Sequence, residues 1–148
     1  MKKIIKWLKH NALYLSLGIV LLGLIGSLYA SEVAGLAPCV LCWYQRLALY
    51  PLAVILAVGI ILKDHKVFHY AIAFPIFGAL VAFYHVLISS GVFPVVLEAC
   101  QVGVPCAQVS WSFGFITLPV LSLIAFLVII ALLFLYKKQN RSLFDLIR

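Results

Sequence analysis

The clearest pattern along the chain is a series of long apolar stretches separated by short polar segments. The stretches cover residues 12–30, 42–62, 67–88 and 115–136. Each has about 20 residues, which in a helix rising about 1.5 Å per residue matches a hydrocarbon core of roughly 30 Å. Backbone groups in lipid must bond internally, so helices are expected. The pattern predicts an all-α bundle of four transmembrane helices, forming a single domain over residues 1–148.

The composition agrees with a membrane protein. The 148 residues are 66% hydrophobic and 10% charged, whereas a soluble domain is about half apolar and about a quarter charged. The net charge of +7 would suit nucleic acid only if the basic residues formed one face with aromatic side chains among them. They flank the apolar stretches instead, so we expect contact with membrane lipid and no nucleic acid.

The basic residues also predict the orientation. Ten of the eleven lie before the first stretch, between the second and third, or after the fourth: Lys2, Lys3, Lys6, Lys9, Lys63, Lys66, Lys137, Lys138, Arg141 and Arg148. The positive-inside rule then places both termini in the cytoplasm and the other two loops outside. The carboxyl-terminal tail should rest on the anionic inner leaflet.

The first stretch has some features of a secretory signal peptide, including a basic start and Ala30-Ser31. Its apolar run is longer than the usual region of about 7 to 15 residues, and Leu28 is unsuitable three residues before a cleavage site. We therefore expect an uncleaved membrane anchor.

Both predicted outer loops carry cysteines, at positions Cys39, Cys42, Cys100 and Cys106. An oxidising compartment permits disulfides, and four cysteines allow three pairings. The spacing suggests two local pairs, and Gly103 and Pro105 suit the turn that the second pair needs. Two pairs on one face favour thiol–disulfide exchange between them, with a simple staple of the second loop as the alternative.

The first pair lies at the predicted start of a helix, after Pro38. The positive end of the helix dipole favours a thiolate there. Spacings of three and four place Cys39, Cys42 and Arg46 on one helix face. A guanidinium one turn from a thiol would stabilise a thiolate or an oxyanion on a bound ring.

Several simpler interpretations compete. A disulfide closing so short a loop would stabilise the fold little. A zinc site would need the Cys100–Cys106 spacing as its second half, which is unusual, so no metal is expected. Arg46 could extend to the surface. An interfacial aromatic belt would account for Trp43, Tyr44, Trp111, Phe113 and Phe115.

His85 lies toward the outer end of the third stretch. An ionisable residue at membrane depth is a candidate for function, although a hydrogen-bonded histidine can also serve packing. Pro51, Pro75 and Pro119 should bend their helices and free carbonyl groups. Such bends can open a groove for a flat ring or serve packing alone.

The segment from Cys39 to Arg46, Cys-Val-Leu-Cys-Trp-Tyr-Gln-Arg, resembles the signature of the DsbB thiol–quinone oxidoreductases. The segment Cys100–Cys106, with Gly-Val-Pro inside it, resembles the shorter loop of the BdbC branch from Gram-positive bacteria. Residues 111–119 are similar to the family's entry to its fourth helix. The resemblance covers about residues 12–136 and differs from the Gram-negative pattern, whose second pair flanks a longer loop with an interfacial helix.

The resemblance implies a multi-pass protein of the bacterial cytoplasmic membrane, with its active cysteines on the outer face. It implies a protein-dithiol:quinone oxidoreductase that reoxidises an extracytoplasmic thioredoxin-like thiol oxidase of the DsbA/BdbD type. The partner would reduce Cys100–Cys106 through a mixed disulfide at Cys100, and Cys39–Cys42 would reoxidise that pair. Cys42 would pass electrons to the quinone. The quinone site would comprise Cys42, Arg46 and His85, with menaquinone favoured over ubiquinone.

Three other functions were weighed. A vitamin K epoxide reductase-like quinone reductase would carry its C-x-x-C in a later helix. A reductant that moves electrons outward would need cysteines on the inner side, where this chain has none. A non-enzymatic membrane scaffold with disulfide-stapled loops would not require Arg46 in line with the cysteine pair.

Overall fold

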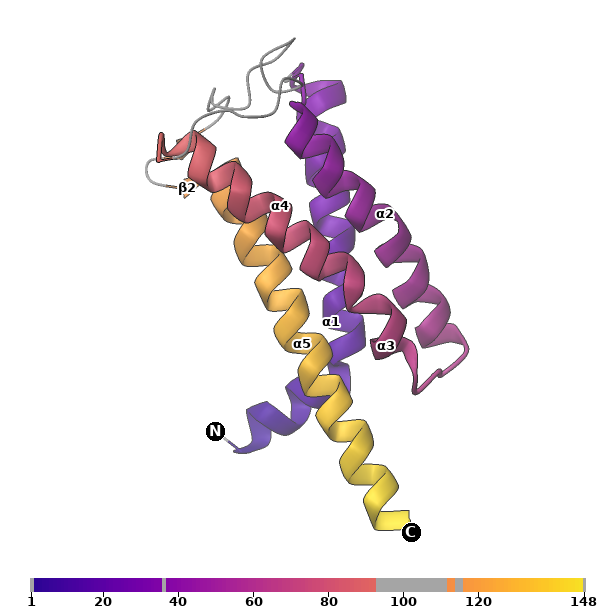
Figure 1. Ribbon diagram of the computed structural model, residues 1–148. Helices are drawn as coiled ribbons and strands as arrows, with labels where there is room; N and C mark the ends of the chain where they lie inside the picture. The colour runs from indigo at the N-terminus through magenta and orange to yellow at the C-terminus, as the bar shows by residue number, and fades with distance from the viewer. Residues whose placement is uncertain (1, 36, 93–111, 114–115, 148) are drawn as a thin grey trace.

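The computed structural model describes residues 2–35, 37–92, 112–113 and 116–147. Its helices pack lengthwise into a bundle (Figure 1). The α-helices are α1 (Lys2–Leu28), α2 (Val40–Ile61), α3 (Val67–Ala71), α4 (Ala73–Ser89) and α5 (Leu118–Ile147). A π-helical segment, η1 (Tyr29–Val33), continues α1, and two short strands, β1 (Ser112–Phe113) and β2 (Ile116–Thr117), precede α5.

Four segments of the described chain are long and apolar enough to cross a membrane. They are Asn11–Val33, Val40–Ile61, Val67–Ser89 and Leu118–Gln139. The predicted helical bundle with four such segments is therefore confirmed. The third segment is not one continuous helix, because α3 and α4 are separated at Ile72. Pro75 explains the break, since it has no N–H to bond the carbonyl of Ala71 four residues earlier.

The start of α5 differs from the simplest expectation. Strands β1 and β2 pair antiparallel, with Ser112 opposite Thr117, and the helix begins at Leu118, a few residues after the approximate start at 115. Pro119 is thus the second residue of α5, where a missing N–H breaks no helical hydrogen bond. Pro119 therefore gives α5 no reason to bend, contrary to expectation. Pro51, by contrast, lies inside α2.

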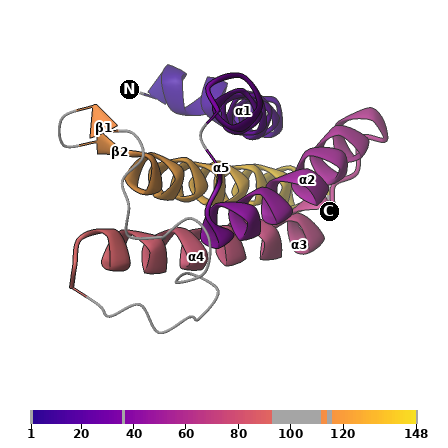
Figure 2. The ribbon, with the colours of Figure 1, turned by 90° about the horizontal axis from the view of Figure 1, so that it is seen from above.

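The helices form a closed ring in the order α1, α2, α4, α5, so that each contacts two neighbours (Figure 2). The start of α1, the end of α5 and the α2–α3 connection lie at one end of the bundle (Figure 1). The start of α2, the end of α4 and the strands lie at the opposite end. The ring therefore brings four helices around the first cysteine pair.

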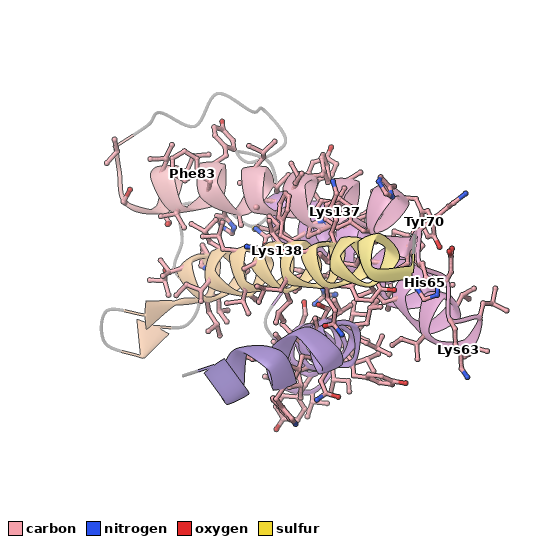
Figure 3. The ribbon with its side chains drawn as sticks, turned by 90° about the horizontal axis from the view of Figure 1, so that it is seen from below. Lys63, His65, Tyr70, Phe83, Lys137 and Lys138 are labelled. Carbon is pink, nitrogen blue, oxygen red and sulfur yellow. The ribbon has the colours of Figure 1, made fainter. Side chains whose placement is uncertain are left out.

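The α2–α3 connection is held by Asp64. Its carboxylate accepts hydrogen bonds from the Tyr70 hydroxyl and, at 2.8 Å, from the Lys66 N–H, and its carbonyl accepts one at 3.2 Å from the Tyr136 hydroxyl. The bond from Tyr70 is the main reason that the pKa of the Asp64 carboxyl is lowered. Lys63 adopts a left-handed conformation at φ 51°. Figure 3 views this end of the bundle, with Lys63, His65 and Tyr70 grouped around the connection.

Close packing between α4 and α5 depends on Gly78. A Cβ atom at this position would overlap the ring of Phe126, which is itself 2% exposed. Small residues let membrane helices approach closely, and their interfaces rely on such contacts. The Phe126 ring also contributes to the wall of the cavity described below, so this contact links packing to the site.

Candidate redox site

Cys39 is the amino-terminal cap of α2. Its backbone is extended (φ −70°, ψ 167°), and its sulfur accepts a hydrogen bond at 3.4 Å from the backbone N–H of Cys42. The first N–H groups of a helix have no partner inside it, so a side chain that accepts from them stabilises the helix start. Capping by Cys39 thus holds both sulfurs at the positive end of the helix dipole.

The two sulfurs lie side by side. The structure holds Cys39 and Cys42 as free thiols, with their Sγ atoms 3.0 Å apart. Cys39 is buried and Cys42 is half-buried. The hydrogen bond from Cys42, reinforced by His85, outweighs burial and lowers the pKa of the Cys39 thiol to about 4. In the reduced pair, the thiolate is therefore favoured at Cys39.

His85 on α4 is the third member of this cluster. Its Nε2 atom lies 3.8 Å from the Cys39 sulfur, and its Nδ1 atom lies 3.4 Å from the side-chain nitrogen of Gln45 on α2. His85 and Gln45 are both buried. An amide nitrogen only donates, so this arrangement makes Nδ1 the acceptor and places the ring proton on Nε2, toward Cys39.

Arg46 is fixed by the end of the first span. Its Nε donates at 2.6 Å to the hydroxyl of Ser27, and its Nη2 donates at 3.0 Å to the hydroxyl of Ser31 and also to the carbonyl of Ser27. Its guanidinium carbon lies 5.4 Å from the ring centre of Trp43. At 4% exposed, Arg46 is buried in the bundle and does not extend to the surface. Ser31 belongs to η1, a type of helix frequent at functional sites.

A cavity of about 340 Å³ connects these groups. Its polar wall includes Cys39, Cys42, Gln45, Arg46 and His85, together with the serines Ser27, Ser89 and Ser122. The rest is mainly apolar and comes from α1 and α5, including Ile19, Leu22, Gly23, Leu118, Leu121, Ala125, Phe126 and Ile129. Ligand pockets in proteins have this character, with an apolar wall and a few polar groups that fix orientation.

The structure brings together Cys39, Cys42, Arg46 and His85 of the predicted site residues. Cys100 and Cys106 lie outside the described residues. His85, expected near a ring, lies beside the Cys39 sulfur and also lines the cavity.

Three further polar residues were not singled out from the sequence: Ser27, Ser31 and Gln45. Ser27 and Ser31 are four residues apart, so they share a face at the carboxyl-terminal end of the first apolar segment. Hydroxyls placed in this way often bond across helices in membranes, and this was the available signal. Gln45 precedes Arg46 directly, and nothing in the sequence relates it to His85.

These elements define a membrane-spanning helical bundle with a thiol pair beside a mainly apolar cavity. The family described as disulfide bond formation protein DsbB matches residues 9–136. The chain is 42% identical over 135 residues to disulfide bond formation protein C of Bacillus subtilis (strain 168), covering 86% of this chain and 94% of the relative. It is 37% identical over 132 residues to a probable disulfide formation protein of Metapseudomonas resinovorans, covering 88% and 92%.

A third relative, probable disulfide formation protein C 2 of Bacillus cereus (strain ATCC 10987 / NRS 248), is 39% identical over 132 residues, covering 88% of this chain and 94% of the relative. No solved structure matches the chain significantly. The chain belongs to the DsbB family of disulfide bond formation proteins. It is accordingly a multi-pass membrane protein with an oxidoreductase role in disulfide formation.

Proposed function

We propose that the protein is a protein-dithiol:quinone oxidoreductase, which takes electrons from an extracytoplasmic thiol oxidase and passes them to a membrane quinone. The observation that carries this proposal is the cavity, because the Cys39–Cys42 pair and the buried Arg46 share its wall. A scaffold with stapled loops would need neither the cavity nor a buried cation beside the thiols.

The residues around the cavity fit a quinone. The volume of about 340 Å³ falls within the range of roughly 300–1,000 Å³ typical of small-molecule sites. The apolar wall suits a ring with a hydrocarbon tail, and the Arg46 guanidinium suits a ring oxygen that gains negative charge on reduction. When bound, the quinone supplies an acceptor for two electrons and two protons.

The sulfur pairs would act in series. The partner's dithiol is oxidised as the Cys100–Cys106 disulfide is reduced, with Cys100 forming the mixed disulfide, and the new dithiol then reduces Cys39–Cys42. Each exchange moves two electrons and two protons between sulfur pairs. The roles of Cys100 and Cys106 rest on the family resemblance. We assign delivery to the quinone to Cys42, one helical turn from Arg46.

Protons and charge would be managed by Cys39, His85 and Gln45. The Nε2–H of His85 lies toward the Cys39 sulfur, so it stabilises the thiolate that forms when the Cys39–Cys42 disulfide is opened. Gln45 holds the imidazole in this tautomer. Stabilising the reduced form of the pair in this way favours electron transfer into it.

We place the protein in the bacterial cytoplasmic membrane, with both termini inside and the cysteine end of the bundle outside. The basic residues at the opposite end support this orientation under the positive-inside rule. The expected partner is a thioredoxin-like thiol oxidase of the DsbA/BdbD type. The BdbC-like second loop favours menaquinone, with ubiquinone as the second option.

The test is a turnover assay with the purified full-length protein in detergent. A reduced thioredoxin-like oxidase is added together with menaquinone or ubiquinone, and quinone reduction is followed by its ultraviolet absorbance. Cys42→Ser should abolish turnover, whereas Cys39→Ser and Cys100→Ser should each block a different exchange. Failure of the wild-type protein to reduce either quinone with any such partner would refute the proposal.

A further inference from the structure

Three atoms that bind soft metal ions meet at the start of α2. The sulfurs of Cys39 and Cys42 and the Nε2 atom of His85 all lie within 4.8 Å of one another. Cys39 and His85 are buried and Cys42 is half-buried. Two thiolates and one imidazole, with a fourth position left open, are a ligand set known in zinc sites.

The distances are close to those that a tetrahedral ion requires. Zn–S bonds of about 2.3 Å and Zn–N bonds of about 2.0–2.1 Å imply donor atoms roughly 3.5–3.8 Å apart. The Cys39 sulfur is 3.8 Å from the His85 nitrogen and 3.0 Å from the Cys42 sulfur. The sulfurs would have to separate by roughly 0.8 Å to reach this geometry. Side-chain rotation at the half-buried Cys42 is sufficient for so small a change.

Gln45, which contacts His85, can also support a metal-bound histidine. A metal on Nε2 requires the ring proton on Nδ1, and this proton needs an acceptor. Half a turn of the Gln45 side-chain amide replaces its nitrogen by its oxygen, which then accepts from Nδ1–H. Gln45 thus supports His85 in both tautomers, as a donor when the thiolate is free and as an acceptor when a metal is bound.

Charge favours a divalent ion. Two thiolates and a neutral imidazole carry a total charge of −2, which a divalent cation cancels within its own ligand set. An uncompensated charge in such a position is costly. The open fourth position can be taken by water from the cavity that the cysteines line.

We propose that the dithiol form of the Cys39–Cys42 pair, together with His85, binds one thiophilic divalent cation such as Zn²⁺. Both sulfurs bind as thiolates, any proton that they still carry is released to solvent, and no electrons move. The disulfide form has no thiolates and does not bind. A bound ion prevents both sulfurs from re-forming a disulfide, so the ion inhibits turnover, and this last consequence alone rests on the proposed function.

The test uses Cd²⁺, whose bonds to thiolates absorb in the ultraviolet. Full-length protein carrying Cys100→Ser and Cys106→Ser is titrated in detergent, both reduced under anaerobic conditions and after oxidation. We expect saturation at one equivalent in the reduced protein, competition by Zn²⁺, and no signal after oxidation. His85→Ala and Gln45→Leu should each weaken binding by about tenfold or more. His69→Ala is the matched control, since His69 is exposed on α3, and it should bind as the parent does.

Absence of the Cd²⁺ signal in the reduced protein would overturn the proposal, as would unchanged affinity in both His85→Ala and Gln45→Leu. Two variants are used because either could alter folding, which thermal unfolding of each would reveal. The wild-type turnover assay is run in parallel. Quinone reduction without Cd²⁺ binding contradicts the metal site alone, whereas Cd²⁺ binding without quinone reduction contradicts the proposed function alone.

Discussion

Cys39 combines burial with a low pKa because hydrogen bonds from Cys42 and His85 favour its thiolate more than burial opposes it. A lower thiol pKa stabilises the dithiol form at any pH above that pKa. The corresponding disulfide is then a stronger oxidant. The residue's environment therefore bears on how readily the pair accepts electrons.

The first prediction concerns His85→Ala. Loss of the bond from Nε2 should raise the pKa of Cys39 and make the reduction potential of the pair more negative. At a pH above the Cys39 pKa of both proteins, each unit by which the pKa rises destabilises the reduced pair by about 1.4 kcal/mol. This lowers its two-electron reduction potential by about 30 mV. Thiolate absorbance against pH and equilibration with glutathione measure the two effects in the Cys100→Ser, Cys106→Ser background. The wild-type thiolate should persist until the pH falls to about 4. An unchanged titration in His85→Ala would mean that the histidine only packs.

The second prediction concerns Ser27→Ala. Its hydroxyl accepts from Arg46 at 2.6 Å, so its loss should leave the guanidinium less well placed. The apparent KM for quinone should rise by about tenfold, the equivalent of a charged hydrogen bond of about 1.5 kcal/mol, with kcat changed less. Ser16→Ala is the control, since Ser16 is another serine of α1 but bonds the carbonyl of Ala12 in its own helix. Equal effects from both substitutions would indicate a purely structural role.

Sequence spacing predicted that Cys39, Cys42 and Arg46 share a face because they belong to one helix. Ser27, Ser31 and Gln45 were missed because their roles depend on how different helices face one another. No local pattern encodes the rotation of α1 against α2, or of α4 against α2. The residues that hold the site together thus became evident only in the assembled bundle.

At the scale of the elements, α4 and α5 meet closely where Gly78 faces Phe126. A side chain at Gly78 would push the ring away, and that ring is part of the cavity wall. The width of the cavity therefore depends on a glycine that does not itself line it.

The third prediction is that Gly78→Ala lowers both stability and quinone affinity. Overpacking a helix interface costs about 1–3 kcal/mol. Alanine is about 1 kcal/mol more favourable than glycine inside a helix, so the substitution is destabilising when the overpacking cost exceeds this gain. Thermal unfolding in detergent and the quinone KM measure the two effects. Gly18→Ala provides the control, because a Cβ there meets nothing within 4 Å. If Gly78→Ala were as stable as Gly18→Ala, the close approach would not matter.

Element boundaries were the least predictable part of the fold. Apolar length indicated where helices could cross a membrane but not where they break. Pro75 was expected to bend its helix, and the separation of α3 from α4 three residues earlier follows from its missing N–H. Strand β2 pairs with β1, a contact that the continuous apolar run around it gave no reason to expect.

At the scale of the whole molecule, the ring of helices places the α2–α3 connection at the opposite end from the cysteine pair (Figure 1). Lys63 and Lys66 lie in or beside that connection. The architecture follows well from the sequence because apolar length and charge position act over whole segments. The cavity does not, since it is lined by side chains from four separate helices.

The fourth prediction tests orientation. In a variant without the native cysteines, His65→Cys should react with a membrane-impermeant maleimide only after the membrane is permeabilised. A variant that retains Cys42 alone should react with intact cells if the reagent reaches the half-buried thiol. Glu32→Cys, at an exposed position near the cysteine end of the bundle, provides a more accessible reporter. Labelling of His65→Cys in intact cells would reverse the proposed orientation.

Lys63 shows that folding and membrane insertion impose different demands on one position. Its left-handed backbone costs a residue with a side chain roughly 1–2 kcal/mol, whereas glycine adopts it freely. Lys63→Gly should therefore make the connection easier to fold, yet under the proposed orientation it would remove one of the positive charges that retain a loop in the cytoplasm during insertion. A chain optimised only for its final stability would carry glycine here. Lysine at this position is what we expect if the direction of insertion, decided before the bundle assembles, constrains the sequence more strongly.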